Sequence, residues 1–281
     1  MNDKITILTP LFLNHHKLSM FEVSIKSFYD NMEKPYPLHI IKDDSPLPLH
    51  EEAKKIIGKI NDNHLFLPRT TKTNGFEVII ELIDKVTTDY FFFIIDDAAM
   101  TISKDFITPI ITHMEKNKKT IQVKIGGGVL CRPNVSNLHN ITLNEDDTLY
   151  LNANKNVKWY PSRMGKDTIW TMELKDKNIK GEMAITYWNC VLRTNIFKKI
   201  NNIIKDKKGK FKDKFWHDYQ SYTNYGGDIN DKVFNNGWPD GFEFLNNYDS
   251  GWLNMCCYIY PFGRSPIPYN IFKTTHTKEK K

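Results

Sequence analysis

Short apolar runs alternate with segments of helical periodicity over the first 115 residues. The run ITIL (5–8) ends at Thr9 and Pro10. Apolar residues then recur at spacings of three and four: Leu18, Phe21, Ile25, Phe28 and Met32. This pattern predicts a strand followed by an amphipathic helix.

The same alternation continues along the chain. Strands are predicted over 38–45, 64–68 and 90–95, and a helix over 51–60. Another helix follows Gly75, where apolar residues share one helical face: Ile79, Leu82, Ile83 and Val86. Repeated strand–helix units imply an α/β fold with a mixed, mostly parallel sheet flanked by helices.

The second half of the chain has a less regular pattern. Strands or a ribbon are predicted over 121–131 and 148–160, and a buried strand over 183–193 with a helix directly behind Thr194. We assign no role to residues 132–182. This half is therefore expected to be irregular.

The stretch YFFFIIDDAAM (90–100) runs from six consecutive apolar residues into two carboxylates. A strand so apolar is buried on both faces, so Asp96 and Asp97 must emerge at its carboxyl end. Two adjacent carboxylates repel each other unless a cation neutralises them. Oxygen ligands favour Mg²⁺ or Mn²⁺, and such an ion would in turn bind a diphosphate.

The composition is that of a soluble globular protein. The chain has 281 residues, 40% hydrophobic and 26% charged, which suffice for a substantial core. Its net charge of +6 gives only a mild field and does not indicate nucleic-acid binding. Basic residues gather at 205–214 and 273–281; these runs are expected to be solvated, with weak association with an acidic membrane surface as the alternative.

Cysteine usage favours a reducing compartment. Cys131, Cys190, Cys256 and Cys257 show no CxxC spacing, so we expect reduced thiols and a cytoplasmic protein. The segment MNDKITIL reads as a first strand rather than a secretory signal. No run approaches the roughly 20 apolar residues that span a bilayer, so no transmembrane segment is expected.

Polar residues follow the predicted strands of the first half, at the edge where a parallel sheet binds its ligands. The loops supply Thr9 and Pro10; Asp43, Asp44 and Ser45; Arg69, Asn74 and Gly75; and Asp96 and Asp97. Ionised carboxylates accept hydrogen bonds from ribose and base donors. For Asp43 and Asp44 a simple turn is the alternative. Arg69 or Lys72 either contacts phosphate or lies at the surface.

Together these motifs resemble a family 2 glycosyltransferase of the GT-A fold. The resemblance covers residues 4–115: a TP strand end, IIKDDS, an Asn-Gly pair that opens a helix, and an apolar strand that runs into Asp-Asp. It implies a GT-A (Rossmann-like) fold in a single domain over 1–281. The nucleotide-sugar-binding half would span 1–115, the acceptor-side half 116–270, and a basic tail 271–281.

The resemblance implies a transferase that moves a sugar, with inversion, from a nucleotide-diphosphate sugar to a hydroxyl of a glycan or other acceptor. The segment YGGDINDKVFNNGW (225–238) is similar to the family's Gly-Glu-Asp-x-Asp-Leu helix, which places the catalytic base at Asp228. Gly227 stands where the family has Glu, and Asn230 replaces the next acid. His217 and Asp218 are the alternative acid–base pair.

The family's divalent metal, Mn²⁺ or Mg²⁺, would fall on Asp97, with Asp96 contacting ribose or a metal-bound water. His276 stands where some members complete the metal shell. The family motif is Asp-x-Asp, whereas Ala98 and Ala99 follow here, so a metal-free enzyme is an alternative.

Tryptophans of the second half offer flat apolar surfaces to a sugar acceptor, and we place Trp188 and Trp238 on the acceptor side. Two other functions stay open. A sugar-nucleotide nucleotidyltransferase would share the front half, but TPLFLNHHKLS lacks the glycine-rich loop expected there. A catalytically inactive nucleotide-sugar or glycan-binding protein would keep the pocket without the base.

Overall fold

The computed structural model describes residues 2–15, 17–30, 32–69, 75–94, 96, 98–100, 105–125, 160–164, 167–176, 185, 190–207, 238, 241–254 and 259–261. The chain divides into two compact units, Met1–Phe106 with Cys257–Lys281 (unit 1) and Ile107–Cys256 (unit 2). The single domain with halves at 1–115 and 116–270 stays a prediction. Across the described residues, no helix has the length and apolar character to cross a membrane.

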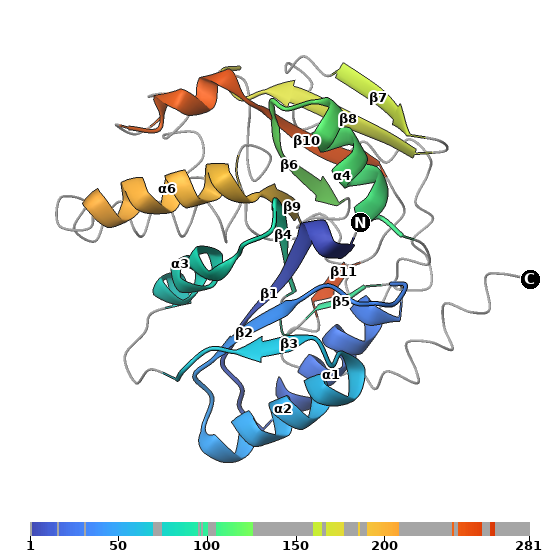
Figure 1. Cartoon of the computed structure of the whole chain (residues 1–281), viewed down its shortest axis with the longest axis vertical. Coiled ribbons are helices and arrows are strands. Elements are labelled where there is room, and N and C mark those ends of the chain that lie inside the picture. Colours follow the sequence, from blue (N-terminus) through green and yellow to red (C-terminus); the bar gives the residue numbers. More distant parts are fainter. Residues whose placement is uncertain are drawn as a thin grey trace, which may run out of the picture. The chain divides into compact units, whose positions relative to one another are not determined.

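Unit 1 contains a parallel sheet with the strand order β3-β2-β1-β4 (Figure 1). Its strands are β1 (Ile5–Leu11), β2 (His39–Asp43), β3 (His64–Phe66) and β4 (Tyr90–Phe93). A short 3-10 turn, η1 (Asn2–Lys4), precedes β1. A separate antiparallel pair joins β5 (Ala98–Met100) to β11 (Ile259–Pro261).

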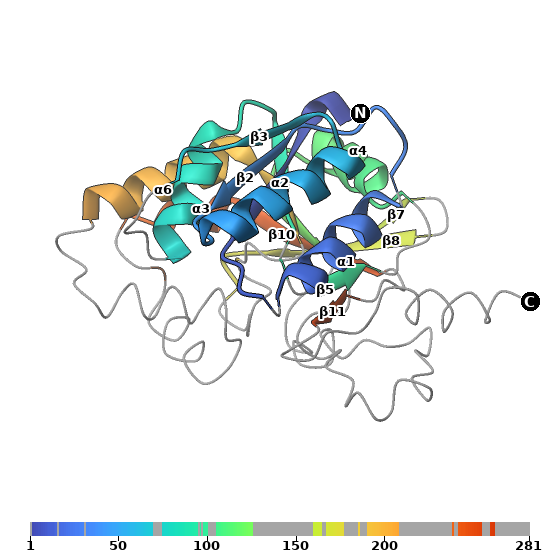
Figure 2. The ribbon, with the colours of Figure 1, turned by 90° about the horizontal axis from the view of Figure 1, so that it is seen from below.

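Three helices connect these strands: α1 (Lys17–Tyr29), α2 (Leu47–Ile60) and α3 (Gly75–Lys85). Helices α1 and α2 pack against each other, as Figure 2 shows, whereas α3 packs on β1 and β2. In Figure 1, β1 and β2 lie between α3 and the α1–α2 pair. The predicted sheet flanked by helices is therefore present in unit 1.

The chain reverses its direction across the sheet once. It moves outward from β1 to β2 to β3, and then α3 returns it past β1 to β4. Because such crossovers are right-handed, the reversal places α3 on the opposite face from α1 and α2. This makes the boundary between β1 and β4 a topological switch point, where open α/β sheets bind ligands beyond the carboxyl ends of the strands.

Strand β1 runs through Thr9 and Pro10 to Leu11, so the strand end predicted at Thr9 is wrong. Pro10 is tolerated because its backbone nitrogen faces β4 and not β2. The Leu8 carbonyl accepts from Ile94 after β4, and the Leu11 carbonyl accepts from Asp44 after β2. Because backbone groups alternate between the two sides of a strand, Pro10 faces the same side as Leu8. There the pairing has already ended at Phe93, opposite Leu8, and the missing N–H of Pro10 costs no ladder bond.

Strand β4 is buried at every residue, as its apolar run predicted. Phe92 stacks on Phe28 of α1 with ring centroids 5.5 Å apart, and Phe106 lies against both rings. Aromatic pairs of this kind add to the burial energy of a core. This packing fixes the strand immediately before Asp96.

The described strands of unit 2 form a mixed sheet with the order β9-β6-β10-β8-β7, in which β6 and β10 pair in parallel and the other neighbouring strands are antiparallel. Its strands are β6 (Thr120–Ile125), β7 (Tyr160–Met164), β8 (Asp167–Glu173), β9 (Cys190–Arg193) and β10 (Asp249–Asn254). Its helices are α4 (Ile107–Lys116), α6 (Thr194–Lys207) and the 3-10 helix η5 (Glu243–Asn247).

The α/β class with a mixed sheet and helices is confirmed, but parallel pairing dominates only in unit 1. In unit 2, β7 and β8 form an antiparallel ribbon inside residues 132–182, to which we assigned no role. Strand β10, which sequence reasoning missed, approaches β6 closely. A Cβ on Gly251 would lie 3.0 Å from Val123 Cγ2, so the missing side chain permits this pairing.

Candidate functional site

An ion pair lies beyond the carboxyl ends of β1 and β4, at the topological switch point. Lys17 Nζ lies 3.0 Å from Asp96 Oδ2. The Asp96 side chain is 15% exposed and the Lys17 side chain 38% exposed, so the pair is accessible from solvent. The sequence predicted a cation beside the paired acids, and for Asp96 the protein itself supplies one, an ammonium group.

The backbone holds Lys17 in place. Its N–H donates to Asn14 Oδ1 at 3.0 Å, so Asn14 caps the first turn of α1. Asn14 belongs to the loop that leaves β1, and Asp96 follows β4. The ion pair therefore joins the two segments on either side of the switch point.

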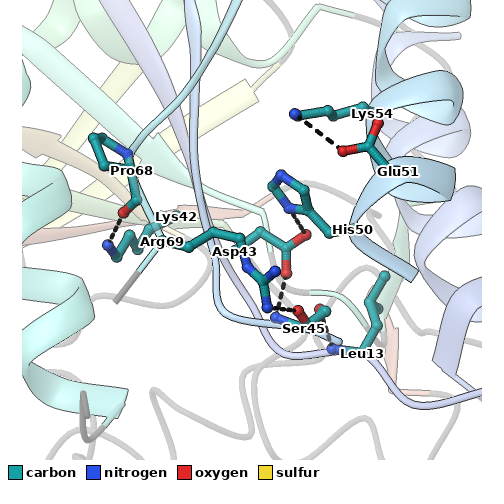
Figure 3. A network of polar contacts seen from close by, with 9 residues as sticks. All are labelled: Leu13, Lys42, Asp43, Ser45, His50, Glu51, Lys54, Pro68 and Arg69. Carbon is teal, nitrogen blue, oxygen red and sulfur yellow. Dashed lines mark hydrogen bonds and ion pairs between the residues drawn. The ribbon is translucent and has the colours of Figure 1, made fainter. Parts of the chain in front are cut away.

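Asp43, at the end of β2, is fully buried and accepts two hydrogen bonds from the protein (Figure 3). Its Oδ1 accepts from the Ser45 N–H at 2.8 Å, and its Oδ2 lies 2.7 Å from Nδ1 of His50 on α2. This is the turn chemistry that the sequence left open as an alternative for Asp43. The carboxylate of Asp43 is directed into the protein.

Ser45 extends this network to the neighbouring strand ends. Its Oγ accepts from the Leu13 N–H at 2.7 Å, and its carbonyl accepts from Nη2 of Arg69 (Figure 3). The Asp44 N–H donates to the Leu11 carbonyl at 3.1 Å. Asp44 itself is half-buried at the tip of a loop that is anchored on both sides.

Lys42 is a fully buried lysine on β2. Its ammonium donates to the Pro68 carbonyl and lies 3.3 Å from Oε2 of Glu81 on α3. Buried ammonium groups require such partners because desolvation of an unpaired charge is costly. Lys42 thus ties the segment after β3 and helix α3 to the second strand.

Thr9, predicted to contact the nucleotide, is fully buried within β1. Its hydroxyl lies 2.8 Å from Nε2 of His39. Burial lowers the pKa of His39 to about 3, and the nearby His64 acts in the same direction. The Thr9 hydroxyl is therefore bound to a neutral imidazole inside the protein. Pro10, the next residue, is half-buried.

The other predicted residues fall in different places. Arg69 is an exposed residue that contacts the Ser45 carbonyl, and Gly75 is the first residue of α3. In unit 2, Trp238 is half-buried and its indole N–H donates to Asn246 Oδ1 at 3.0 Å. The remaining predicted site residues lie outside the described residues: Asn74, Asp97, Trp188, Asp228 and His276, with the alternatives Lys72, His217 and Asp218.

Sequence reasoning missed Lys17, Lys42 and His50. Lys42 left a signal, because it is a lysine that directly follows the apolar residues Ile40 and Ile41 within the predicted second strand. His50 sits on the face of α2 that packs toward β2, but no spacing rule links it to Asp43. Lys17 had no signal, because its partner lies 79 residues away along the chain.

The described acids do not by themselves form a metal centre. Among the residues that the structure describes, no group of three or more His, Cys, Asp or Glu side chains is arranged to hold an ion. At the switch point the described donors are one carboxylate and one ammonium. Hard cations take several oxygen ligands, and Asp97, the predicted metal ligand, lies outside the described residues.

No protein-family model and no curated protein matches this sequence. Among solved structures, S. aureus TarS 1-349 is similar with TM-score 0.42 and 9% identity, over 73% of this chain and 49% of that chain. A mannosyltransferase from Pyrobaculum calidifontis, solved with GDP-Man and Mn²⁺, gives TM-score 0.36 and 11% identity over 44% of this chain and 35% of its own.

Glucosyl-3-phosphoglycerate synthase from Mycobacterium tuberculosis gives TM-score 0.32 and 14% identity, over 44% of this chain and 43% of its own. This chain therefore spans less than half the length of each of the three structures. Likenesses this weak establish neither a shared fold nor a shared activity.

Proposed function

We propose that this protein is a glycosyltransferase of the GT-A type that binds a nucleotide-diphosphate sugar at the switch point between β1 and β4. The observation that carries the proposal is the parallel order β3-β2-β1-β4, with charged loops at its carboxyl end. The motifs on which the sequence resemblance rests lie near the carboxyl ends of β1, β2 and β4 and at the start of α3. Parallel sheets of this topology bind nucleotides at that edge.

The donor contacts divide among the loops of unit 1. Asp44 accepts from ribose or base donors, and Arg69 provides a charge-assisted contact to phosphate. Asn74 and Gly75, at the start of α3, bring backbone N–H groups to the donor. Asp43 holds the Asp44 loop through its bonds to Ser45 and His50, rather than binding the donor directly.

The transfer step is a direct displacement. The acceptor oxygen bonds to the anomeric carbon, the bond from that carbon to the diphosphate oxygen breaks, and the diphosphate leaves with the electron pair. Asp228 takes the proton of the acceptor hydroxyl, a role typically worth roughly 10²- to 10⁴-fold in rate. Attack opposite the leaving group inverts the anomeric centre, and Trp188 and Trp238 face the acceptor sugar.

A divalent ion at Asp97, completed by His276, and a metal-free enzyme are the two forms that this proposal allows. Addition of Mn²⁺ to the binding experiments distinguishes them. The cytoplasmic location and a weak membrane-surface association through the basic runs stay predictions.

A thermal-shift panel tests donor binding. UDP, GDP, dTDP and ADP, and the sugars UDP-GlcNAc and GDP-Man that occur in the names of similar structures, are added with and without Mn²⁺. One nucleotide class should raise the unfolding temperature, since a ligand at 100 times its dissociation constant adds about 2.7 kcal/mol of stability. No shift with any nucleotide would overturn the proposal.

Two variants separate an enzyme from an inactive binder. With the donor that binds, Asp228→Asn should abolish turnover and keep the thermal shift. Asp44→Ala should reduce the thermal shift itself. The exposed Asp62, beyond α2, provides the matched control, and Asp62→Ala should change neither property. Turnover that survives in Asp228→Asn would remove Asp228 from the mechanism.

A further inference from the structure

We propose that Lys17 binds the diphosphate of the donor, and that Asp96 is the positioning residue that holds its ammonium group. This inference rests on the proposed function, since it names a further residue of the same site. It assigns Asp96 a different role from ribose or metal contact. The juxtaposition that carries it is an accessible lysine–aspartate pair at the topological switch point.

The location follows from the fold. Lys17 opens the helix that leaves β1, and Asp96 follows β4, the strand that pairs with β1 on the far side of the reversal. Open α/β sheets bind nucleotide ligands beyond the carboxyl ends of the two strands at the switch point, so the sugar donor is expected beyond β1 and β4. A diphosphate bound there would lie near the charges of this pair.

The charge of the site also requires a cation. A buried or half-buried carboxylate alone would repel a diphosphate, and Asp96 is only 15% exposed. An ammonium group has three N–H donors, and one of them is directed at Asp96. The Lys17 side chain is 38% exposed, so solvent or a bound anion can reach it.

The geometry restrains Lys17 at both ends. Asn14 fixes its backbone N–H and Asp96 fixes its ammonium group, each at 3.0 Å. A long, flexible lysine that is held in this way loses less conformational freedom when it binds phosphate.

Calorimetric titration tests the proposal. UDP and GDP, with uridine and guanosine as phosphate-free probes, are titrated into the full chain in the presence of EDTA, where no metal contributes. Lys17→Met should raise the dissociation constant of the nucleoside diphosphate at least tenfold and leave that of the nucleoside unchanged. Lys17→Arg should retain most of the affinity, and Asp96→Asn should lose part of it.

Lys26 provides the matched control, because Lys26→Met removes the same charge from the exposed face of the same helix. It should change diphosphate binding less than twofold. If Lys17→Met does not fold, Lys17→Gln replaces it. Equal weakening of nucleoside and diphosphate, or no change in either, overturns the role of Lys17. If the unsubstituted chain binds nucleotide only with Mn²⁺, the same variants are compared with Mn²⁺ present. If it binds no nucleotide with or without Mn²⁺, the proposed function itself fails.

Discussion

At the residue scale, the carboxylates at the strand ends differ in what surrounds them. Asp43 is fully buried and both its oxygens accept hydrogen bonds from the protein, whereas Asp96 is partly exposed and faces an ammonium group. Asp43 ends β2 and Asp96 follows β4, so both acids come after apolar strand residues. Asp43 therefore stabilises the fold through its buried hydrogen bonds, whereas Asp96 lies at the proposed donor site.

Removal of Asp43 should destabilise the protein. Asp43→Ala leaves the Ser45 N–H and the His50 ring without their acceptor, and an unsatisfied buried group costs about 1–3 kcal/mol. We expect the free energy of unfolding, measured in urea, to fall by about 3 kcal/mol. Asp62→Ala, on an exposed residue, should change it by less than ~0.5 kcal/mol. Equal effects of the two variants would mean that the network is not stabilising.

The buried His39 should make stability depend on pH. Burial lowers the pKa of His39 from 6.5 to about 3, so the unfolded chain takes up this proton at a higher pH than the folded chain. The stability is fully present above pH 6.5 and is lost as the pH falls toward 3. Between pH 7 and 5 this one group should account for a loss of about 2 kcal/mol in the free energy of unfolding.

Urea unfolding at pH 7 and pH 5 checks this dependence. His39→Phe should lose less stability between the two pH values than the unsubstituted chain does. His15→Phe, which changes an exposed histidine, should keep the full difference. His113 also has a pKa lowered by burial, to about 4, and should contribute a similar, separate loss. An unchanged pH difference in His39→Phe would contradict the assignment.

At the element scale, three polar side-chain contacts hold the β3–α3 segment to β2 and to Ser45 in the loop that follows it. Lys42 binds the Pro68 carbonyl and Glu81, and Arg69 binds the Ser45 carbonyl. These contacts come immediately before and after the loop that the proposal assigns to donor binding. Helix α3 packs on β1 and β2 through its apolar face, and the Lys42–Glu81 pair fixes its register on that surface.

Breaking this ion pair from one side should be costly. Glu81→Gln leaves the fully buried Lys42 ammonium without its counter-charge. Because the Glu81 side chain is 32% exposed and water screens the pair, we expect a loss of about 2 kcal/mol in the free energy of unfolding. Hydrogen exchange of the α3 amides should accelerate in parallel.

The Lys55–Glu52 pair on the exposed face of α2 is the control, and Glu52→Gln should cost less than ~0.5 kcal/mol. The double variant Lys42→Met/Glu81→Gln should recover part of the loss, because no buried charge then remains unpaired. If the loss in the free energy of unfolding of the double variant equals the sum of the losses of Lys42→Met and Glu81→Gln, the two residues do not interact.

At the scale of the whole molecule, the described residues form two compact units of different character. Unit 1 is parallel and carries the switch point, whereas unit 2 is mixed and mostly antiparallel. Parallel sheets covered by helices favour ligand binding at one edge. Donor binding is therefore expected to act on unit 1.

Hydrogen exchange with the bound nucleotide tests this division. With UDP or GDP, whichever stabilises the protein, protection should appear in peptides that cover 11–17, 43–47 and 94–96. The ribbon of β7 and β8 should exchange at an unchanged rate. Protection confined to that ribbon would place the nucleotide elsewhere and contradict the proposed site.

Local patterns predicted much of unit 1. The strands at 39–43 and 90–93 and the helix that begins at Gly75 follow directly from apolar periodicity, which reports which face of an element is buried. The end of β1 was misplaced, because Pro10 usually marks a strand end and only the short β4 beside it makes it acceptable. Strand β10 was missed, because it pairs with β6 and β8, which lie far away along the chain.

The sequence by itself determined the α/β class, the buried central strand and the acidic residues that follow the strands. Only the tertiary structure decided which acid is internal and which faces the switch point, and it paired Lys17 with Asp96. The physical reason is range. Periodicity and turn chemistry act over a few residues, whereas charge neutralisation and burial depend on groups that the fold brings together from distant parts of the chain.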